Sequence, residues 1–416
     1  MAVGQRVIPR PRIRREPNEP RTVHRSIEVF LWSRAAIWIA ALFALEVFAN
    51  GHPTAGARWD RAWMHDSGSV FDVWARWDSS WFLEIARWGY THADHSAAFY
   101  PLYPGLVGGL GRVFFGHYVA AGVAISLVCA LGAFILLERL AERHLGAEGA
   151  RRAVLYLALF PMALFLQAVY SESLCLLLCL AAFLLAERDR FLPAALCTGL
   201  ALLTRPNALA VVPALAILAW QSRDRLRSLA SLVVIPLVFA AYPLVLWQQK
   251  GSAWEFLHTE LRGGGWHRGV SHAGPLGGIW EGLRAGWAGV RQLAAGADGH
   301  VYWPAAGDTP PLRAAALNLE QLGFLCLFVW LTVVAWRRFG AAYGVFCAVS
   351  LAIPLSLPNE EWPLLSLPRF GLLIFPFFLA LAAVGGRPRV HTAIVAVSSI
   401  LLGVTIVEWV LWHWVA

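Results

Sequence analysis

Residues 77–104, WDSSWFLEIARWGYTHADHSAAFYPLYP, follow the first long apolar run and decide how the rest of the chain is interpreted. Residues 71–90 contain no proline and a single glycine, which predicts a helix. On a helical wheel, one face of it carries four tryptophans and an isoleucine: Trp74, Trp77, Trp81, Ile85 and Trp88. Such a face beside charged residues is typical of a helix lying in a membrane interface. The pattern therefore predicts Asp78, about 60° from the centre of the face, at the boundary between lipid and water.

The composition is that of a membrane protein. Of 416 residues, 58% are hydrophobic and only 14% are charged, whereas a soluble domain carries about 25% charged residues. The mean hydropathy is +0.56. We therefore expect an all-α, multi-pass protein embedded in the lipid bilayer, with a single membrane domain over residues 29–416.

The net charge of +8 comes almost wholly from arginine, because Lys250 is the only lysine. Basic loops in membrane proteins mark the cytoplasmic side. No aromatic–basic repeat or binding module supports nucleic acid as a partner. The six cysteines all lie in apolar runs and are expected to be small core residues without disulfides.

Charge also predicts the topology. Residues 1–28 are rich in arginine and proline and are expected to form a disordered cytoplasmic tail. Two long loops, residues 50–117 and 249–312, are expected on the outer side. Residues 98–116 are apolar but broken by prolines, and we expect them to be partly embedded or re-entrant. About eleven membrane segments are predicted: 29–49, 118–137, 153–170, 174–187, 191–204, 206–220, 228–248, 313–335, 340–357, 369–385 and 391–412.

Two features bear on that topology. The arms 191–204 and 206–220 are each shorter than the roughly 20 residues that a full span needs, so this hairpin is not expected to cross completely. No internal repeat is found, which argues against a carrier built from repeated halves.

Metal chemistry has little support in the sequence. Asp60, Asp66, Asp72 and Asp78 are spaced six apart, so consecutive members point to different sides of a helix. The chain contains no D-x-D, H-E-x-x-H, G-x-S-x-G or Walker motif. A metal site at His92, His95 and Asp94 is the alternative, but histidines on a solvated loop usually bind none. No metal or other cofactor is expected.

Arginine is the informative residue type. Arg205 and Arg369 border apolar runs on the predicted outer side, and Arg268 lies in the second outer loop. An arginine near lipid is costly unless it is paired or functional, and its guanidinium suits a pair of phosphate oxygens. The alternative for each is a salt bridge or an interfacial anchor. Glu172 has a matching alternative role as the internal partner of one of these arginines.

Several blocks of sequence motifs lie along the chain. The first block is W-D-x-x-x-F-x-x-I-A-x-x-G-Y at 77–90, followed by A-F-Y-P-x-x-P at 98–104. Later blocks are YSESL at 170–174, TRPN at 204–207 and SLPRF at 366–370. Together they resemble the motifs of the PIG-V-type mannosyltransferases, which add the second mannose in glycosylphosphatidylinositol assembly, and of their prokaryotic relatives. Phe370 stands where tyrosine is frequent in the family, and Tyr100 where phenylalanine is frequent; both exchanges conserve shape.

The resemblance implies a GT-C glycosyltransferase fold with a catalytic carboxylate in the first outer loop. It also implies a polyprenyl-phosphate sugar as donor, usually mannose, and transfer with inversion to a glycolipid or glycan acceptor. Asp78 is the expected general base, with Asp60 and Glu172 as alternatives, because one carboxylate suffices for a single displacement. Arg369, Arg268 and Arg205 are expected at the donor phosphate. The expected substrate-binding or supporting residues are Glu172, Tyr90, Asn207, Trp77 and Tyr103.

Two other functions compete with this one. The same fold with another polyprenyl-linked sugar, such as arabinose or glucose, is the first, and a lipid flippase or transporter is the second. A transporter should place charges at mid-membrane, whereas here they cluster at segment ends and in the outer loops. Convergence of Asp78 and the three arginines on one cavity would favour an enzyme. The arginine-rich, lysine-poor composition is typical of a GC-rich prokaryote, so we expect a bacterial plasma membrane. The predicted topology puts the active site on its outer side.

Overall fold

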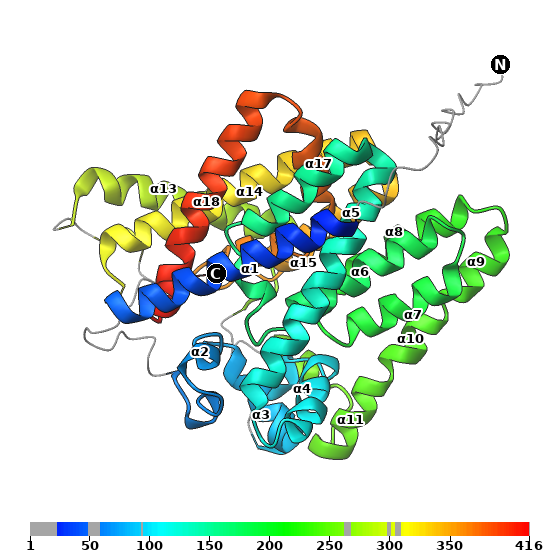
Figure 1. Cartoon of the computed structure of the whole chain (residues 1–416), viewed down its shortest axis with the longest axis horizontal. Coiled ribbons are helices and arrows are strands. Elements are labelled where there is room, and N and C mark those ends of the chain that lie inside the picture. The colour runs from blue at the N-terminus through cyan, green and yellow to red at the C-terminus, as the bar shows by residue number, and fades with distance from the viewer. Residues whose placement is uncertain are drawn as a thin grey trace.

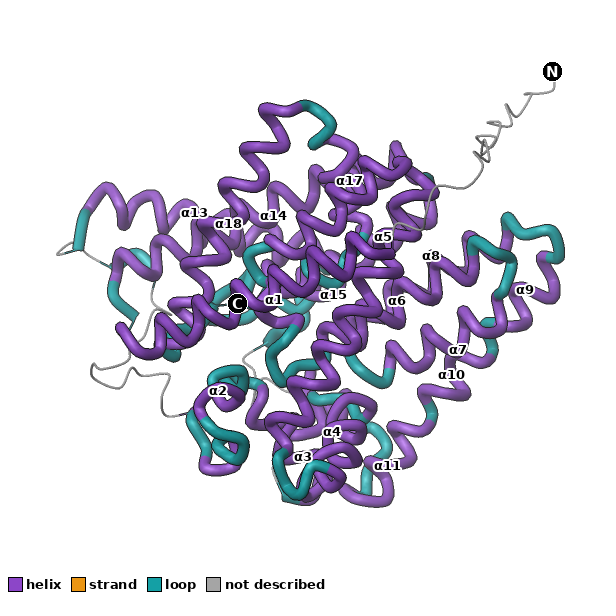
Figure 2. The backbone as a smooth tube through the Cα atoms, in the orientation of Figure 1, coloured by secondary structure: helices purple, strands orange, loops and turns teal. Residues whose placement is uncertain are grey.

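The protein is almost entirely helical. The computed structural model describes residues 23–48, 59–92, 95–261, 268–297, 301–303 and 309–415. Within these ranges there is no β-strand, only an isolated bridge between Arg268 and Asn359. Figures 1 and 2 show helices packed side by side, with irregular segments passing between them. The expected all-α class is confirmed.

Five helical segments are long and apolar enough to cross a membrane. They are α1 (Val23–Phe48), α5 (Tyr118–Leu159), the run Arg225–Lys250, α14 (Pro311–Phe339) and α18 (Pro388–Val410). Four shorter apolar helices are α6 (Glu172–Ala186), α7 (Phe191–Leu202), Pro206–Trp220 and α15 (Ala341–Ser356). The chain is an integral membrane protein. The number eleven stays a prediction, because these shorter helices fall below the length of about 20 residues for a full span.

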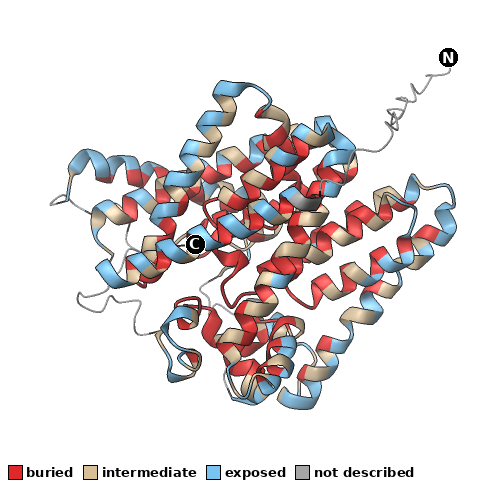
Figure 3. Cartoon of the chain, in the orientation of Figure 1, coloured by how far each residue is buried: buried red, intermediate tan, exposed pale blue. Residues whose placement is uncertain are grey.

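The remaining elements are shorter or lie between these helices. The α-helices are α2 (Ser69–Asp72), α3 (Ser79–Trp88), α4 (Leu102–Val113), α8 (Val211–Trp220), α9 (Arg225–Ser231), α10 (Val234–Phe239), α11 (Ala241–Lys250), α12 (Glu255–Leu261), α13 (Pro275–Ala295), α16 (Leu367–Gly371) and α17 (Pro376–Val384). The 3-10 helices are η2 (Ala62–Met64), η3 (Gly89–Thr91), η4 (Ser96–Ala98), η5 (Ala163–Leu166) and η6 (Pro206–Ala210). The core runs through the centre of the molecule, and the exposed faces lie on its peripheral helices (Figure 3).

The expected continuous helix over residues 71–90 is wrong. It breaks between α2 and α3, and Trp77 has a φ of 53°. Tertiary hydrogen bonds replace the helical ones: the Val169 N–H donates to the Trp74 carbonyl over 3.0 Å, and the Tyr170 hydroxyl donates to the Arg76 carbonyl over 3.1 Å. The break makes Asp78 the residue that directly precedes α3.

The tryptophan face also does not meet lipid as expected. Trp74, Trp77 and Ile85 are buried inside the protein, while Trp88 is 43% exposed. Trp77 packs edge-on against Trp412 and Trp414 near the C-terminus, with ring centroids 5.8 and 5.0 Å away. Because the helix is interrupted between α2 and α3, the two parts of the segment do not form one continuous face. Trp74 and Trp77 are instead part of the protein core.

Residues 98–116 do not cross the membrane as a helix. α4 has 12 residues, or about 18 Å, against a hydrocarbon core of about 30 Å. The loop that precedes α2 also returns to the start of α5. Asp66 accepts hydrogen bonds from the N–H groups of Tyr118 and Val119, and the Ser67 hydroxyl accepts one from Ala120. The loop before α2 is therefore bound to the N-terminus of α5, which directly follows residues 98–116 and His117 in the sequence.

The two segments predicted at 118–137 and 153–170 form one helical run with a break. Gly146, with φ 70° and ψ −179°, separates the two arms of α5. The second arm ends at Leu159 rather than residue 170, because Pro161 disfavours a helical conformation at the preceding residue. Buried Arg34 of α1 donates to the carbonyls of Ala163 and Ala158 at this helix end. The buried irregular segment that follows delivers Tyr170, Ser171 and Glu172 to the interior.

The predicted outer loop 249–312 contains a long helix, α13. Its glycines lie against α14 and α15, and a Cβ at Gly278 would stand only 2.2 Å from the Leu355 carbonyl oxygen. The opposite face exposes a stripe of large apolar side chains: Leu276, Trp280, Leu283, Trp287 and Val290. The loop therefore carries a packed element. Its outer location stays a prediction, as do the domain limits, and the tail predicted at residues 1–28 lies mostly outside the described residues.

Candidate active site

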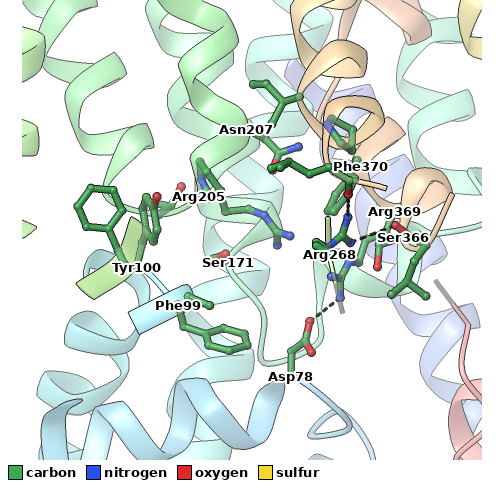
Figure 4. Close-up of a pocket in the computed structure, with 18 of the residues that line it drawn as sticks. Asp78, Phe99, Tyr100, Ser171, Arg205, Asn207, Arg268, Ser366, Arg369 and Phe370 are labelled. Atoms are coloured by element: carbon green, nitrogen blue, oxygen red, sulfur yellow. Dashed lines mark hydrogen bonds and ion pairs between the residues drawn. The ribbon is translucent and has the colours of Figure 1, made fainter. Parts of the chain in front are cut away.

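A cavity of about 360 Å³ lies where several distant segments meet. Its walls come from the start of α3, the start of α6, the turn before η6, the end of α15 and the loop into α16. Asp78, Arg205, Arg268 and Arg369 all line it (Figure 4). These four residues, which the sequence analysis singled out, are thus brought together. The pair Asp78 and Arg369 is 291 positions apart in the sequence.

Asp78 is held at the cavity wall by its own backbone. Its N–H donates to the Tyr170 hydroxyl over 3.0 Å, and that hydroxyl in turn donates to the Arg76 carbonyl. The side chain is nearly buried, and its Oδ2 accepts a hydrogen bond from Arg369 Nη1 at 2.8 Å. Two elements and the buried segment before α6 therefore fix the position of this carboxylate.

Arg369 is shared between two carboxylates. Besides Asp78, its Nε lies 3.5 Å from Glu172 Oε1. Its guanidinium also lies 5.5 Å from the ring centroids of both Phe165 and Tyr170. These contacts satisfy a buried cation with two anions and two aromatic faces.

Glu172 opens α6 and is completely buried. It forms ion pairs with Arg205 and Arg369, which is the arrangement expected of an internal partner for an arginine. Arg205 stands in extended conformation directly before η6, whose first residue is Pro206. The Glu172 carboxylate therefore holds two guanidinium groups at the cavity wall through ion pairs.

Arg268 is positioned by main-chain atoms. Its Nη1 donates to the Leu357 carbonyl over 3.1 Å, and its Nη2 to the Leu365 carbonyl over 3.3 Å. All three arginine guanidinium groups surround the Phe370 ring, at 5.8 Å for Arg369, 5.9 Å for Arg205 and 6.0 Å for Arg268. The Phe370 ring is therefore the shared aromatic contact of the three guanidinium groups.

The charges at the cavity do not cancel. The three arginines contribute three positive charges, and Asp78 and Glu172 contribute two negative ones. The net charge of one positive unit suits a ligand that carries a single negative charge. The rest of the wall is mostly apolar, with Phe99, Phe256, Leu257, Leu209, Ile353 and Pro354.

The other expected residues divide into two groups. Asn207 lines the cavity. Tyr90 and Tyr103 are buried away from it: the Tyr90 hydroxyl donates to the Phe99 carbonyl over 2.7 Å, and the Tyr103 hydroxyl lies 2.9 Å from Ser126 Oγ. Trp77, packed against the C-terminal tryptophans, also lies outside the cavity lining. These three side chains support the walls.

Asp60 and Asp72, two other members of the aspartate series, lie elsewhere. Asp60 pairs with His65 at 2.6 Å, and Asp72 accepts a hydrogen bond from the Ser67 N–H. Neither lines the cavity. The geometry therefore favours Asp78 over Asp60 as the reactive carboxylate.

The residues of the alternative metal site are not brought together in the described part of the chain. His92 stacks on Trp88, with ring centroids 5.2 Å apart, and Asp94 lies outside the described residues. In the described part of the chain, no group of three or more His, Cys, Asp or Glu side chains is arranged to hold a metal ion.

Several cavity residues were not predicted from the sequence, chiefly Ser171, Ser366 and Phe99. Ser171 stands inside a quoted motif, next to Glu172, so its place beside two polar site residues was the available signal. Tyr170 was also not predicted as the anchor of Asp78, because no local pattern links residues 92 positions apart.

One comparison with known proteins identifies the chain's relatives. The family model described as Mannosyltransferase (PIG-V) matches residues 65–233. The resemblance is confirmed over this part, which carries Asp78, Glu172 and Arg205. Over these residues the chain is similar to the mannosyltransferases of the PIG-V type, and this similarity suggests a membrane-embedded glycosyltransferase that transfers mannose. A search of curated proteins found no match.

Proposed function

We propose that this protein, on a GT-C fold, transfers mannose from a polyprenyl-phosphate-mannose donor to a hydroxyl of a glycolipid or glycan acceptor. The observation that carries the proposal is the convergence of Asp78 and three arginines on one cavity with a net charge of one positive unit. A carboxylate base to take the acceptor's proton and cations to hold the leaving phosphate are the two requirements of this reaction.

The proposed reaction is a single displacement with inversion. The acceptor oxygen forms a bond to the anomeric carbon as its proton passes to the Asp78 carboxylate. The bond from that carbon to the phosphate oxygen breaks, and the electron pair leaves with the polyprenyl phosphate. Arg205, Arg268 and Arg369 are preorganised to stabilise the charge that grows on the phosphate.

The net charge favours a monophosphate donor. A polyprenyl-phosphate sugar is a phosphodiester with one negative charge, which balances the single positive charge of the cavity. A nucleotide-diphosphate sugar brings two, and the sequence lacks the D-x-D motif commonly used to hold a metal on it. The apolar part of the wall, including Phe256 and Ile353, suits the prenyl chain.

The Arg369–Asp78 pair gives the donor a second role. Without a ligand, Arg369 is bound to the proposed base at 2.8 Å. A donor phosphate competes for the same guanidinium and releases Asp78 to accept a proton. The base would then become available only after the donor has bound.

Two alternatives remain distinct. A polyprenyl-linked arabinose or glucose donor fits the same phosphate site, because the arginines contact phosphate and not the sugar. A flippase or transporter is less favoured, since Asp78 and the arginines converge in one cavity rather than along a path. We further propose that the enzyme resides in a bacterial plasma membrane with the N-terminus in the cytoplasm and the cavity on the outer side, in line with the arginine distribution.

A donor panel tests the proposal. The purified full chain is incubated in detergent with a range of acceptors and, in separate reactions, with polyprenyl-phosphate mannose, polyprenyl-phosphate glucose or nucleotide-linked mannose, and the products are analysed by mass. We expect transfer from polyprenyl-phosphate mannose alone. Transfer from the nucleotide-linked sugar would reject the lipid-donor assignment, and transfer from the glucose donor would support the first alternative.

A further inference from the structure

Four residues of the cavity lining have a buried hydrogen-bond donor without a hydrogen-bond partner among the described residues: Ser171 Oγ, Arg205 Nε, Arg369 Nε and Trp414 Nε1. Arg369 Nε still lies 3.5 Å from Glu172 Oε1 in an ion pair. Ser171 directly precedes α6 and is completely buried, and its Oγ has no hydrogen-bond partner among the described residues. The same holds for the Nε of Arg205, a residue that is 9% exposed. Both residues line the cavity, and Figure 4 shows them on the side away from Arg268 and Ser366.

The unused hydroxyl is unusual for its position. A serine directly before a helix normally accepts a hydrogen bond from a backbone N–H of the first turn, but Ser171 makes no such bond. A buried donor without an acceptor costs free energy, so the fold alone gives no reason for either group. A ligand atom that only accepts hydrogen bonds would satisfy both.

We propose that Ser171 Oγ–H and Arg205 Nε–H together bind one phosphoryl oxygen of a polyprenyl phosphate, in the donor and in the product that leaves. This inference rests on the proposed function for the identity of the lipid phosphate. Ser171 is then a positioning residue for the leaving group, a role that neither the motif match nor the ion pairs assign.

The surroundings favour an anion at this place. The N-terminus of the 15-residue helix α6 carries a partial positive charge. The carboxylate of Glu172 does not oppose it, because Arg205 and Arg369 both form ion pairs with that group. A phosphoryl oxygen accepts from both groups at once, whereas a sugar hydroxyl can donate its own proton here only to Ser171 Oγ, because a guanidinium has no acceptor.

Binding of a polyprenyl phosphate to the full chain in detergent tests the inference without turnover. Ser171→Ala should weaken the Kd about tenfold, as expected for loss of a hydrogen bond to a charged group. Ser171→Thr keeps the hydroxyl and should stay within about threefold of the wild type. Ser173→Ala is the matched control: this serine is equally buried in the first turn of α6, but its hydroxyl donates to the Leu166 carbonyl and does not line the cavity. Its Kd should not change.

Steady-state kinetics provide the second readout. In Ser171→Ala the KM for the acceptor should stay unchanged, while kcat/KM for the donor falls. If Ser171→Ala does not fold, Arg205→Lys replaces it, because lysine keeps the charge and lacks the Nε donor.

The outcomes separate the two proposals. An unchanged Kd in Ser171→Ala, or an equal loss of affinity in Ser173→Ala, would overturn the proposed phosphate contact of Ser171 and Arg205 even if mannose transfer is established. If polyprenyl phosphate binding depends on Ser171 but the protein transfers no mannose, the phosphate contact is supported and the proposed reaction is overturned.

Discussion

At the scale of single residues, the shared guanidinium of Arg369 is the feature with the most consequences. It joins Asp78, at 2.8 Å, to Glu172, at 3.5 Å, inside a cavity that has one more positive than negative charge. Any ligand phosphate at this place must compete with Asp78 for the same cation. The proposed base and the proposed phosphate site are therefore coupled, and variants at either position should affect the other.

The first prediction concerns Asp78→Asn and donor affinity. Removing the negative charge releases Arg369 from its ion pair, so a polyprenyl phosphate should bind about fivefold more tightly, which corresponds to about 1 kcal/mol. Equilibrium binding in detergent measures this. Weaker binding in the variant would show that Asp78 contributes to the phosphate site directly rather than through Arg369.

The second prediction concerns Arg369→Ala. The KM for the lipid donor should rise by about tenfold or more, because a charge-assisted contact to phosphate is lost, while the KM for the acceptor should change little. Since the substitution leaves two buried carboxylates with one partner fewer, Arg369→Lys is measured beside it. Arg152→Ala is the control, because the Arg152 side chain donates a hydrogen bond to the Ala382 carbonyl and does not line the cavity. Unchanged donor dependence would indicate a structural role.

At the scale of elements, the helices position the site through backbone contacts at their ends. The start of α3 places Asp78, the start of α6 places Glu172 and the turn before η6 places Arg205. At the other end of α6, Glu187 joins three helices: it lies 2.7 Å from His144 of α5 and accepts a hydrogen bond from Tyr343 of α15. Both ends of this one helix are thus tied to its neighbours by charge.

The third prediction is a pH-dependent stability from Glu187, in the turn predicted to face the cytoplasm. Burial raises the pKa of this carboxyl, but contacts with His144, Tyr343 and Arg143 outweigh burial and hold the pKa below its ordinary value of 4.5. The stabilisation is therefore present above pH 4.5 and is lost as the pH falls through the lowered pKa.

Thermal unfolding of wild type and Glu187→Gln in detergent, measured from neutral pH down to acid, checks this. We expect the variant to be less stable by about 1–3 kcal/mol at neutral pH, with a gap that closes in acid. Glu148→Gln, which removes an exposed pair with Arg151, should change stability by less than about 1 kcal/mol. A gap that does not depend on pH would contradict the account of Glu187.

The fourth prediction concerns the packing of α13. A Cβ at Gly278 would stand 2.2 Å from the Leu355 carbonyl oxygen, so Gly278→Ala should destabilise the protein by about 1–3 kcal/mol. At Gly323 in α14 a Cβ meets nothing within 4 Å, and Gly323→Ala should be neutral or stabilising by up to about 1 kcal/mol. Equal effects of the two substitutions on the unfolding temperature would contradict the close approach of α13 to α15.

At the scale of the whole molecule, the sequence predicts what depends on local pattern. The apolar runs predicted the helical class, and the short arms 191–204 and 206–220 appear as α7 and Pro206–Trp220. The motif residues Asp78, Arg205 and Arg369 line one cavity, as the sequence analysis expected of residues that share a ligand.

What the local pattern could not predict depends on tertiary contacts. The break before Asp78 exists because Val169 and Tyr170, about 90 positions away, take over its backbone hydrogen bonds. For the same reason Trp77 packs inward on Trp412 and Trp414 instead of toward lipid. The irregular segment after Leu159 was predicted as part of a membrane helix, because its residues are as apolar as those of such a helix.

The most direct test of the central claim is the turnover of Asp78→Asn with polyprenyl-phosphate mannose and its acceptor. The full chain is purified in detergent, and its unfolding temperature and polyprenyl phosphate binding are compared with those of the wild type, to show that the variant is folded. The account predicts a loss of about 10²- to 10⁴-fold in kcat, the usual contribution of a general base. Near-normal turnover by a variant that is folded and binds the lipid phosphate would contradict it.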